Sequence, residues 1–256
     1  MEMNDSNDVA ILIPARYAST RFPGKPLADL CGKSVIRRVC EAAAEACPEI
    51  AVATDDARIA AEVESCGFRA VMTSPAHKTG TDRIIEALDK MGNDPRIVIN
   101  VQGDEPFVRP SQIKSLIRLL DEPDAEIATL AREFDPSDGF EALFDPNKVK
   151  VTFDDCGKAL YFSRSIIPYV RGAEWKEWLA KTKYYIHLGM YGYKTSVLRK
   201  IASMPQSSLE MAESLEQLRW LQAGYRIGVS VTENRTIGID TPDDLEAAKD
   251  FLKQQK

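Results

Sequence analysis

The sequence predicts an α/β domain in which a mainly parallel sheet carries helices on both faces. Two observations point to this class. Short apolar runs alternate with segments of helical periodicity over residues 9–130, and the connections between them are short. The 256 residues, of which 44% are hydrophobic, are enough for one large core. Residues 9–256 are therefore expected to form a single domain.

Five apolar runs in the first half are expected to be strands. Each is short, rich in aliphatic residues and bounded by turn formers, as in the buried strands of a parallel sheet. They occupy residues 9–13, 50–54, 68–72, 97–101 and 126–130. Pro14 is expected to end the first strand, because proline cannot donate a backbone hydrogen bond.

Signals for helix starts and stops lie between these runs. The expected starts share short polar caps, which are Ser34, Asp55 or Asp56, and Thr79–Thr81. Gly92 is expected to close the third helix, over about 82–91. A fourth helix is expected over 111–120.

The second half has a different pattern. Residues 149–153 and 159–162 flank a turn, which predicts a β-hairpin, and the span 134–200 is expected to be an insert. The remaining elements are strands over 184–193 and 227–231, a helix over 210–223, and a last helix that begins at Thr241-Pro242. Within the helix over 210–223, Met211, Leu215 and Leu218 recur at helical spacing and are expected to face the core.

A basic, proline-rich loop follows the first strand. Arg16, Arg21 and Lys25 arrive within ten residues, and three prolines restrict the backbone around them. A loop at this place in an α/β sheet opens onto the crevice where ligands bind, and fixed cations suit a polyphosphate. The alternative is a solvated basic loop. Neither a P-loop nor a GxGxxG fingerprint is present.

Two aspartates are candidates for holding a divalent cation. Asp104 follows the fourth strand, beside Gln102, and Asp240 precedes the last helix. A carboxylate at the end of a central strand can hold a cation that bridges phosphates; the alternative is a role in turns and caps. The segment His77–Arg83 offers hydroxyls, a glycine and an arginine that could read a base edge, or it simply begins a helix.

The motifs together resemble one enzyme family. The stretch Pro14–Leu27 closely resembles the signature of the CMP-Kdo synthetases, which are 3-deoxy-manno-octulosonate cytidylyltransferases of the sugar nucleotidyltransferase superfamily. The same resemblance holds for Tyr161–Arg164, His187–Tyr193, Leu209–Arg219 and Gly238–Pro242. It covers residues 9–250 and implies a Rossmann-like nucleotide-diphospho-sugar transferase fold. It further implies that the hairpin region forms part of the sugar site and a homodimer contact.

The resemblance also assigns roles to residues of this sequence. The catalytic set is Arg16, Arg21, Lys25, Asp104 and Asp240, of which the two aspartates bind Mg²⁺. The expected nucleotide-binding residues are Ala15, Arg16, Thr79, Gly80, Arg83 and Gln102. The expected sugar-binding residues are Arg164, His187, Tyr191, Glu216 and Gln217. Arginine suits a carboxylate and the others suit hydroxyls, although without the resemblance a histidine and tyrosines in a strand are more typical of half-buried packing.

The implied reaction joins CTP and Kdo (3-deoxy-D-manno-octulosonate) into CMP-Kdo and pyrophosphate, which activates Kdo for lipopolysaccharide biosynthesis. The anomeric hydroxyl would attack the α-phosphate in line, a step that needs positioning and charge neutralisation. The alternatives are a cytidylyltransferase for 8-amino-Kdo or sialic acid, or a non-catalytic nucleotide-binding subunit. The segments at Tyr161–Arg164 and His187–Gly189 argue against sialic acid, and the full set of aspartates and loop cations argues against a non-catalytic subunit.

Composition and charge argue against several other classes of protein. The net charge of −6 argues against nucleic-acid binding, and no apolar run is long enough to span a membrane. The five cysteines include no Cys-x-x-Cys pair and are expected to be reduced thiols, in keeping with a cytoplasmic location. Residues 1–8 are polar, lack the apolar core of a signal peptide and are expected to be disordered.

Overall fold

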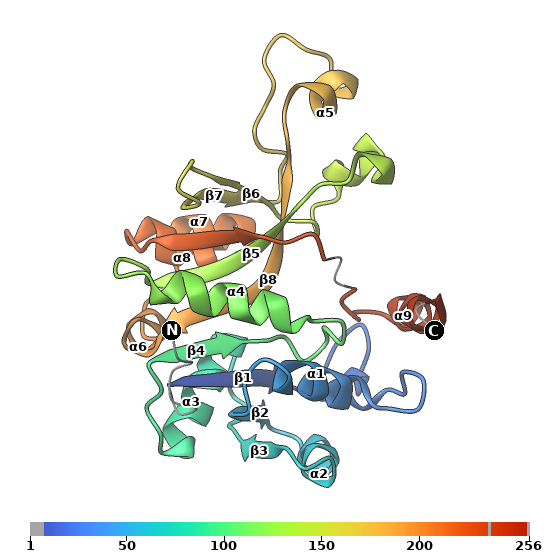
Figure 1. Cartoon of the computed structure of the whole chain (residues 1–256), viewed down its shortest axis with the longest axis vertical. Helices are drawn as coiled ribbons and strands as arrows, with labels where there is room; N and C mark the ends of the chain where they lie inside the picture. The colour runs from blue at the N-terminus through green and yellow to red at the C-terminus, as the bar shows by residue number, and fades with distance from the viewer. Residues whose placement is uncertain (1–7, 235–236, 255–256) are drawn as a thin grey trace.

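The computed structural model describes residues 8–234 and 237–254, which leaves most of the predicted disordered segment 1–8 outside the described residues. One mixed sheet runs through the molecule in the order β3-β2-β1-β4-β8-β5-β9 (Figure 1). Its strands are β1 (Val9–Ala15), β2 (Ile50–Thr54), β3 (Arg69–Met72), β4 (Ile97–Asn100), β5 (Ile127–Glu133), β8 (Tyr185–Lys194) and β9 (Ile227–Val231). Only β8 runs antiparallel to its neighbours on this path. The predicted α/β class with a mainly parallel sheet is confirmed.

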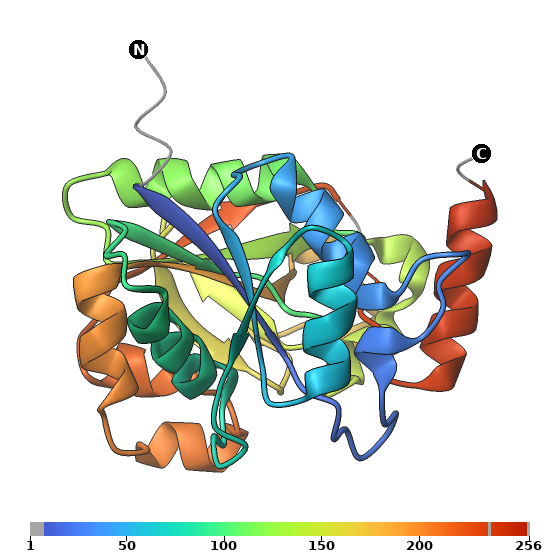
Figure 2. The same cartoon turned by 90° about the horizontal axis from the view of Figure 1, so that it is seen from below.

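Helices cover both faces of the sheet (Figure 2). One face packs against α1 (Val35–Ala44), α2 (Ala57–Ser65) and α4 (Pro110–Asp121). The other packs against α3 (Gly80–Met91), α6 (Thr195–Ala202) and α8 (Gln217–Gln222). Successive side chains of β1 point to opposite faces of the sheet. Ile11 and Ile13 therefore pack in the layer with α1, α2 and α4, and Leu12 packs in the layer with α3, α6 and α8. Among the helices of the described residues, none has the length and apolar character that a bilayer crossing requires.

The predicted helix caps are confirmed. The Ser34 hydroxyl accepts from the Arg37 amide, and the Asp56 carboxylate accepts from the Arg58 amide. Thr79 forms a reciprocal capping box with Asp82 at the start of α3, which ends at a left-handed glycine, Gly92. Because these signals are local, the sequence was sufficient to place the ends of these helices.

The first strand continues beyond the expected end at Pro14. Pro14 and Ala15 still pair with β2, whereas pairing with β4 ends at Leu12. The Leu12 carbonyl accepts from the Val101 amide, so at Leu12 the backbone faces β4. Pro14 lies two residues further on, so its nitrogen faces the same side, where no residue of β4 remains to pair with it. A proline there removes no sheet hydrogen bond.

The expected continuous helix over 210–223 is wrong. Two helices, α7 (Ser208–Glu213) and α8, are separated at Ser214, which is left-handed with φ of 52°. The Arg164 guanidinium binds the carbonyls of Glu213 and Ser214 at the break, which offers these acceptors a partner outside the helix. Met211 is consequently 63% exposed instead of facing the core, while Leu215 and Leu218 are buried as predicted.

The predicted hairpin is confirmed as β6 (Lys150–Phe153) and β7 (Ala159–Ser163), which joins the edge of β8 at Ile186. The span 134–200 around it has two parts. Its C-terminal part, β8 and α6, belongs to the central sheet and its covering layer. The remainder outside the hairpin, residues 134–149 and 164–184, projects from the ends of β5 and β8 as an arm that carries the short helix α5 (Trp178–Lys181) (Figure 1). Phe134, Trp178 and Tyr184 help to form its own small core.

The strained backbone at Ser214 predicts a stability difference. A non-glycine residue in the left-handed region costs roughly 1–2 kcal/mol, which glycine avoids. We expect Ser214→Gly to raise the free energy of unfolding measured by urea denaturation. The matched control is Ser203→Gly at the right-handed C-cap of α6, which should lower it. Equal effects of the two substitutions would contradict this account.

Candidate functional site

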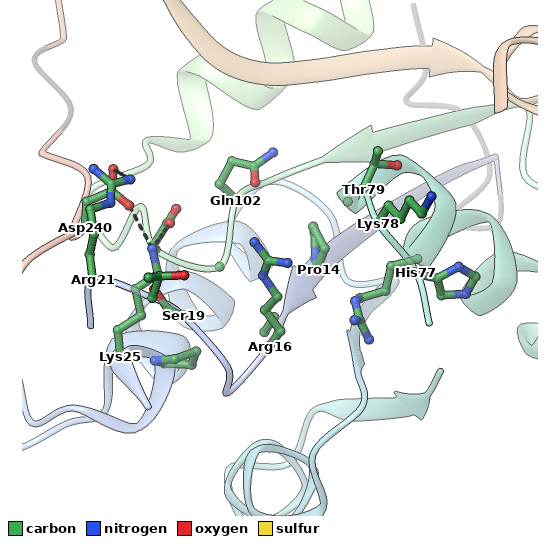
Figure 3. A pocket seen from close by; sticks show the side chains of 17 residues that line it. Pro14, Arg16, Ser19, Arg21, Lys25, His77, Lys78, Thr79, Gln102 and Asp240 are labelled. Atoms are coloured by element: carbon green, nitrogen blue, oxygen red, sulfur yellow. Dashed lines mark hydrogen bonds and ion pairs between the residues drawn. The ribbon is translucent and has the colours of Figure 1, made fainter. Parts of the chain in front are cut away.

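A polar pocket of about 370 Å³ lies at the carboxyl ends of β1 and β4, next to the start of α3 (Figure 3). It collects all ten residues that the sequence marked as catalytic or nucleotide-binding: Ala15, Arg16, Arg21, Lys25, Thr79, Gly80, Arg83, Gln102, Asp104 and Asp240. In Figure 3, Arg21, Lys25 and Asp240 lie at one end of the pocket and His77, Lys78 and Thr79 at the other. Loops from four distant parts of the chain therefore meet at one place.

The basic loop has a defined shape. The Tyr17 carbonyl accepts from the amides of both Ser19 and Gly24, and a short 3₁₀ turn over Lys25–Leu27 follows. Gly24 is left-handed, and a Cβ there would lie 2.9 Å from the Tyr17 ring. The Arg58 guanidinium covers this ring, 3.4 Å from its centroid. The loop is thus held in shape by backbone bonds and one stacked ring rather than by a ligand.

Lys25 joins the two candidate metal-binding aspartates. Its ammonium donates to the Asp104 carboxylate and, at 3.0 Å, to Asp240, which also pairs with Arg21 at 3.0 Å. Burial disfavours the ammonium form of Lys25, but the charge of Asp104 and the bonds to both carboxylates outweigh this effect and raise its pKa. The two carboxylates, far apart in sequence, therefore converge on a single cation position.

Close approach of three backbones brings the aspartates together. The Ile239 amide donates to the Asp104 carbonyl at 2.9 Å, so the segments that carry the two carboxylates are bonded directly. A Cβ on Gly103 would lie 2.8 Å from the Pro14 carbonyl oxygen, which is a contact that only glycine permits without movement. The turn after β4 thus rests against the end of β1.

The residues present fit a divalent cation that binds together with a ligand. Asp104 and Asp240 supply carboxylate oxygens and remain 28% and 49% exposed toward the pocket. Burial, followed by the negative charges of Asp104 and Asp240, raises the pKa of the neighbouring Glu105 to about 7. Across residues 8–234 and 237–254, no group of three or more histidine, cysteine or carboxylate side chains forms a metal cage. Phosphate oxygens and water would have to complete the coordination.

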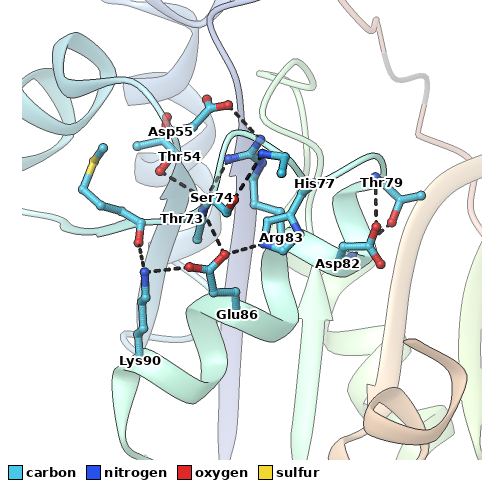
Figure 4. A network of polar contacts seen from close by, with 12 residues as sticks. Thr54, Asp55, Thr73, Ser74, His77, Thr79, Asp82, Arg83, Glu86 and Lys90 are labelled. Atoms are coloured by element: carbon cyan, nitrogen blue, oxygen red, sulfur yellow. Dashed lines mark hydrogen bonds and ion pairs between the residues drawn. The ribbon is translucent and has the colours of Figure 1, made fainter. Parts of the chain in front are cut away.

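A polar network beneath the other end of the pocket holds the segment before α3 (Figure 4). The buried Arg83 donates a hydrogen bond to Thr73 at 2.7 Å and pairs with Asp55 at 3.0 Å. Its side chain lines the pocket, and these bonds hold α3 to the ends of β2 and β3. Glu86 accepts from the Ser74 amide and contacts His77. Bonds from Lys90, Ser74 and His77, in that order, lower the pKa of Glu86 to about 2.

The predicted sugar-binding residues lie outside the lining of this pocket. His187 and Tyr191 are on β8 with ring centroids 5.4 Å apart, and Glu216 and Gln217 are at the start of α8. Burial lowers the pKa of His187 to about 3, so its ring is neutral near pH 7, and its Nε2 lies 3.0 Å from the Thr129 hydroxyl. In this sugar cluster, which comprises His187, Tyr191, Glu216 and Gln217, Tyr191 and Gln217 are buried and the other two are half-buried.

Two bonds link the elements that carry the pocket to those that carry the sugar cluster. The Thr81 hydroxyl in α3 donates to Glu216 at 2.8 Å, and the Gln102 amide donates to the Gly189 carbonyl of β8 at 3.3 Å. Arg164 is placed differently. Its guanidinium donates to the carbonyls of Pro146, Glu213 and Ser214, so a role in binding the sugar carboxylate stays a prediction that would require some of these bonds to break.

The sequence analysis missed several lining residues. Ser19, Thr20 and His77 lie within the motifs but were assigned no role, and Lys78 was not singled out. The only signal for Lys78 was its position between His77 and Thr79. Glu86 was also missed, because its bonds to Ser74 and His77 depend on tertiary packing.

The comparisons with known proteins agree with this geometry. Residues 10–227 match a family model described as Cytidylyltransferase. The 3-deoxy-manno-octulosonate cytidylyltransferase of Porphyromonas gingivalis is 53% identical over 250 residues, covering 98% of each chain. The enzyme of that name from Phocaeicola vulgatus is 54% identical over 245 residues, covering 96% of this chain and 97% of its own.

Solved structures give the same result. The structure of a CMP:2-keto-3-deoxy-manno-octonic acid synthetase complexed with CTP has a TM-score of 0.87 and 40% identity, covering 97% of this chain and 99% of its own. A cytidylyltransferase from Leptospira borgpetersenii, 16% identical with a TM-score of 0.63, shares the fold; the match covers 96% of this chain and 87% of its own. The pocket, the family model and the 53% and 54% identities over nearly the whole length place the chain in the 3-deoxy-manno-octulosonate cytidylyltransferase family.

Proposed function

We propose that this chain transfers CMP from CTP to Kdo, forming CMP-Kdo and pyrophosphate, and so activates Kdo for lipopolysaccharide biosynthesis. The observation that carries the proposal is the convergence of three loop cations and two aspartates in one pocket beside the start of α3. That convergence occurs in a chain of the matching family. It is the arrangement that a nucleoside triphosphate requires.

The loop residues are proposed to bind and orient the triphosphate. Arg16 and Arg21 present planar guanidinium groups, which match phosphate oxygens, and Lys25 presents a compact charge. Thr79 and Gly80, at the start of a twelve-residue helix, would lie against the base. Because in-line displacement at phosphorus depends on orientation and charge stabilisation, the rigid loop supplies much of what the reaction needs.

Nucleotidyltransferases of this family are typically metal-dependent, and we propose Mg²⁺ as the ion, held by Asp104 and Asp240. When bound, it supplies charge neutralisation at the phosphates and acidifies a coordinated hydroxyl. Lys25, together with the Arg21 guanidinium on Asp240, already neutralises both carboxylates in the protein alone. The ammonium is therefore well placed to pair with phosphate oxygens once these carboxylates have another partner.

Kdo is proposed to bind between the pocket and the sugar cluster, with the side chains of Glu216 and Gln217 reading its hydroxyls. Support comes from the Thr81–Glu216 and Gln102–Gly189 bonds, which place that cluster next to the proposed nucleotide site. The neutral His187 ring suits a hydroxyl partner better than a carboxylate. Arg164 remains the proposed carboxylate ligand.

The five cysteines are free thiols in the structure, which supports the proposed cytoplasmic location, where thiols stay reduced.

One assay tests the proposed activity against its alternatives. Pyrophosphate release should require CTP, Kdo and Mg²⁺ together, and should fall sharply when UTP replaces CTP or sialic acid replaces Kdo. Equal or higher activity with 8-amino-Kdo would assign the chain to that sugar. CTP binding without pyrophosphate release from any of these sugars would favour a non-catalytic subunit.

The basic loop yields the next prediction. Arg21→Ala and Lys25→Ala should each reduce kcat/KM by roughly 2–4 kcal/mol of transition-state stabilisation, because each removes a positioned charge. Thermal stability should change little in Arg21→Ala, whose side chain is exposed, and should fall in Lys25→Ala, which leaves Asp104 and Asp240 without their shared ammonium. Lys33→Ala is the matched control, because Lys33 pairs with Glu41 and does not line the pocket. Unchanged turnover in both loop variants would remove the phosphate-binding assignment.

The aspartate pair predicts a catalytic rather than structural metal. Asp104→Asn and Asp240→Asn should fold normally but lose most activity, and extra Mg²⁺ should rescue only part of it. EDTA should abolish turnover without a change in circular dichroism, because Lys25 compensates the carboxylates in the protein alone. If either asparagine variant kept near-normal turnover at saturating Mg²⁺, the two-aspartate site would be withdrawn.

The arm and hairpin are proposed to form a homodimer contact, centred on residues 150–193. Leu160 and Tyr169 there are 63% and 73% exposed, so both side chains offer apolar surface that a partner could cover. We expect a dimer by analytical ultracentrifugation at micromolar concentration, and we expect the double substitution Leu160→Asp/Tyr169→Asp to yield monomers. A wild-type monomer under these conditions would contradict the proposal.

A further inference from the structure

A third apolar cluster lies beside the pocket, apart from the two layers that cover the sheet. It is built largely around α9 (Pro242–Gln254), the helix at the right of Figure 1. Its buried members are Leu30, Val35, Phe107, Ile239, Leu245 and Ala248. Phe22, Phe251 and Leu252 are partly buried against them.

Each segment that carries a charged group of the aspartate site enters this cluster through a nearby apolar residue. Phe22 directly follows Arg21, Phe107 lies three residues after Asp104, and Ile239 directly precedes Asp240. The cluster therefore holds the three segments to one another. The hydrogen bond from the Ile239 amide to the Asp104 carbonyl adds one directional link.

The start of α9 holds Asp240 from its other side. The Asp244 carboxylate accepts from the amides of Asp240 and Thr241 and from the Thr241 hydroxyl, at 2.8–3.0 Å. The backbone of Asp240 is thus part of the helix cap, so a shift of α9 must move it.

Near the other end of α9, Phe251 reaches the segment that follows Asp104. Its ring packs edge-to-face on Phe107, with centroids 4.9 Å apart. The same helix therefore contacts the Asp240 segment through its cap and the Asp104 segment through an aromatic pair. The aromatic pair lies outside the lining of the pocket.

We propose that α9 sets the separation of Asp104 and Asp240, and that Phe251, acting through Phe107, is a positioning residue for this pair. This inference rests on the proposed function. The physical reason is that Mg²⁺ requires near-ideal geometry, so a displacement that the fold tolerates weakens a site with only two protein carboxylates. Loss of the Phe251 ring would loosen Phe107 while leaving the cap and the Ile239–Asp104 bond in place.

The test measures how much Mg²⁺ strengthens CTP binding, using the whole chain without Kdo, so that no turnover occurs. Isothermal titration gives the CTP affinity in MgCl₂ and in EDTA, and the ratio of the two reports the contribution of the aspartate pair. In Phe251→Ala this ratio should fall by about tenfold, the size typical of a lost outer contact at a metal site. The affinity in EDTA should stay within about twofold, because the basic loop is unchanged.

Two further variants separate positioning from general destabilisation. Leu119→Ala removes a partly buried apolar side chain from α4, and we expect it to lower thermal stability without changing the ratio. Phe251→Leu keeps an apolar side chain against Phe107 and should retain most of the ratio. If Phe251→Ala fails to fold, Leu252→Ala on the same cluster replaces it, with a smaller decrease expected.

The outcomes distinguish the two proposals. A wild-type ratio of one would overturn the metal assignment and this inference together. A wild-type enhancement that Asp104→Asn abolishes, but that Phe251→Ala leaves unchanged, would overturn this inference alone. An equal decrease in Leu119→Ala would also overturn it, because the effect would then follow stability and not position.

Discussion

The ammonium group of Lys25, held between the carboxylates of Asp104 and Asp240, is the interaction on which the site depends. Two carboxylates placed this close without a cation would repel, and one would tend to protonate. Lys25 removes that conflict and at the same time joins the loop after β1 to segments far along the chain. The protein therefore holds the acidic pair in place with charges of its own.

The mixed sheet explains how the two proposed binding regions come to be adjacent. Because β8 runs antiparallel between β4 and β5, the residues that resemble sugar ligands lie directly beside the strand end that carries Gln102 and Asp104. The Gln102–Gly189 bond crosses this boundary on one side, and Thr81 bonds Glu216 across the other. Reaction between a nucleotide and a sugar needs two such regions side by side in a fixed orientation.

Much of the polar chemistry around the pocket holds its walls and need not touch a ligand. The guanidinium of Arg83 donates to Thr73 and Asp55. The Glu86 carboxylate accepts from the Ser74 amide and contacts His77. Arg164 similarly binds carbonyls at the break between α7 and α8. Residue type and motif do not distinguish such supporting groups from ligands, since an arginine suits both tasks.

The sequence by itself determined the features that depend on neighbours along the chain. These are the short apolar strands, the caps at Ser34 and Thr79, the closing Gly92 and the cationic loop. The ten pocket residues came from the motifs together with the family that they resemble. Tertiary structure alone decided the place of β8 within the sheet, the break at Ser214, the bonds that occupy Arg164, and the packing of α9 against Phe107. The physical reason is the range of the interactions. The hydrogen bonds of a cap or a turn are made within a few residues of the chain. These four features depend on partners that folding brings from distant positions, so the local sequence pattern does not predict them.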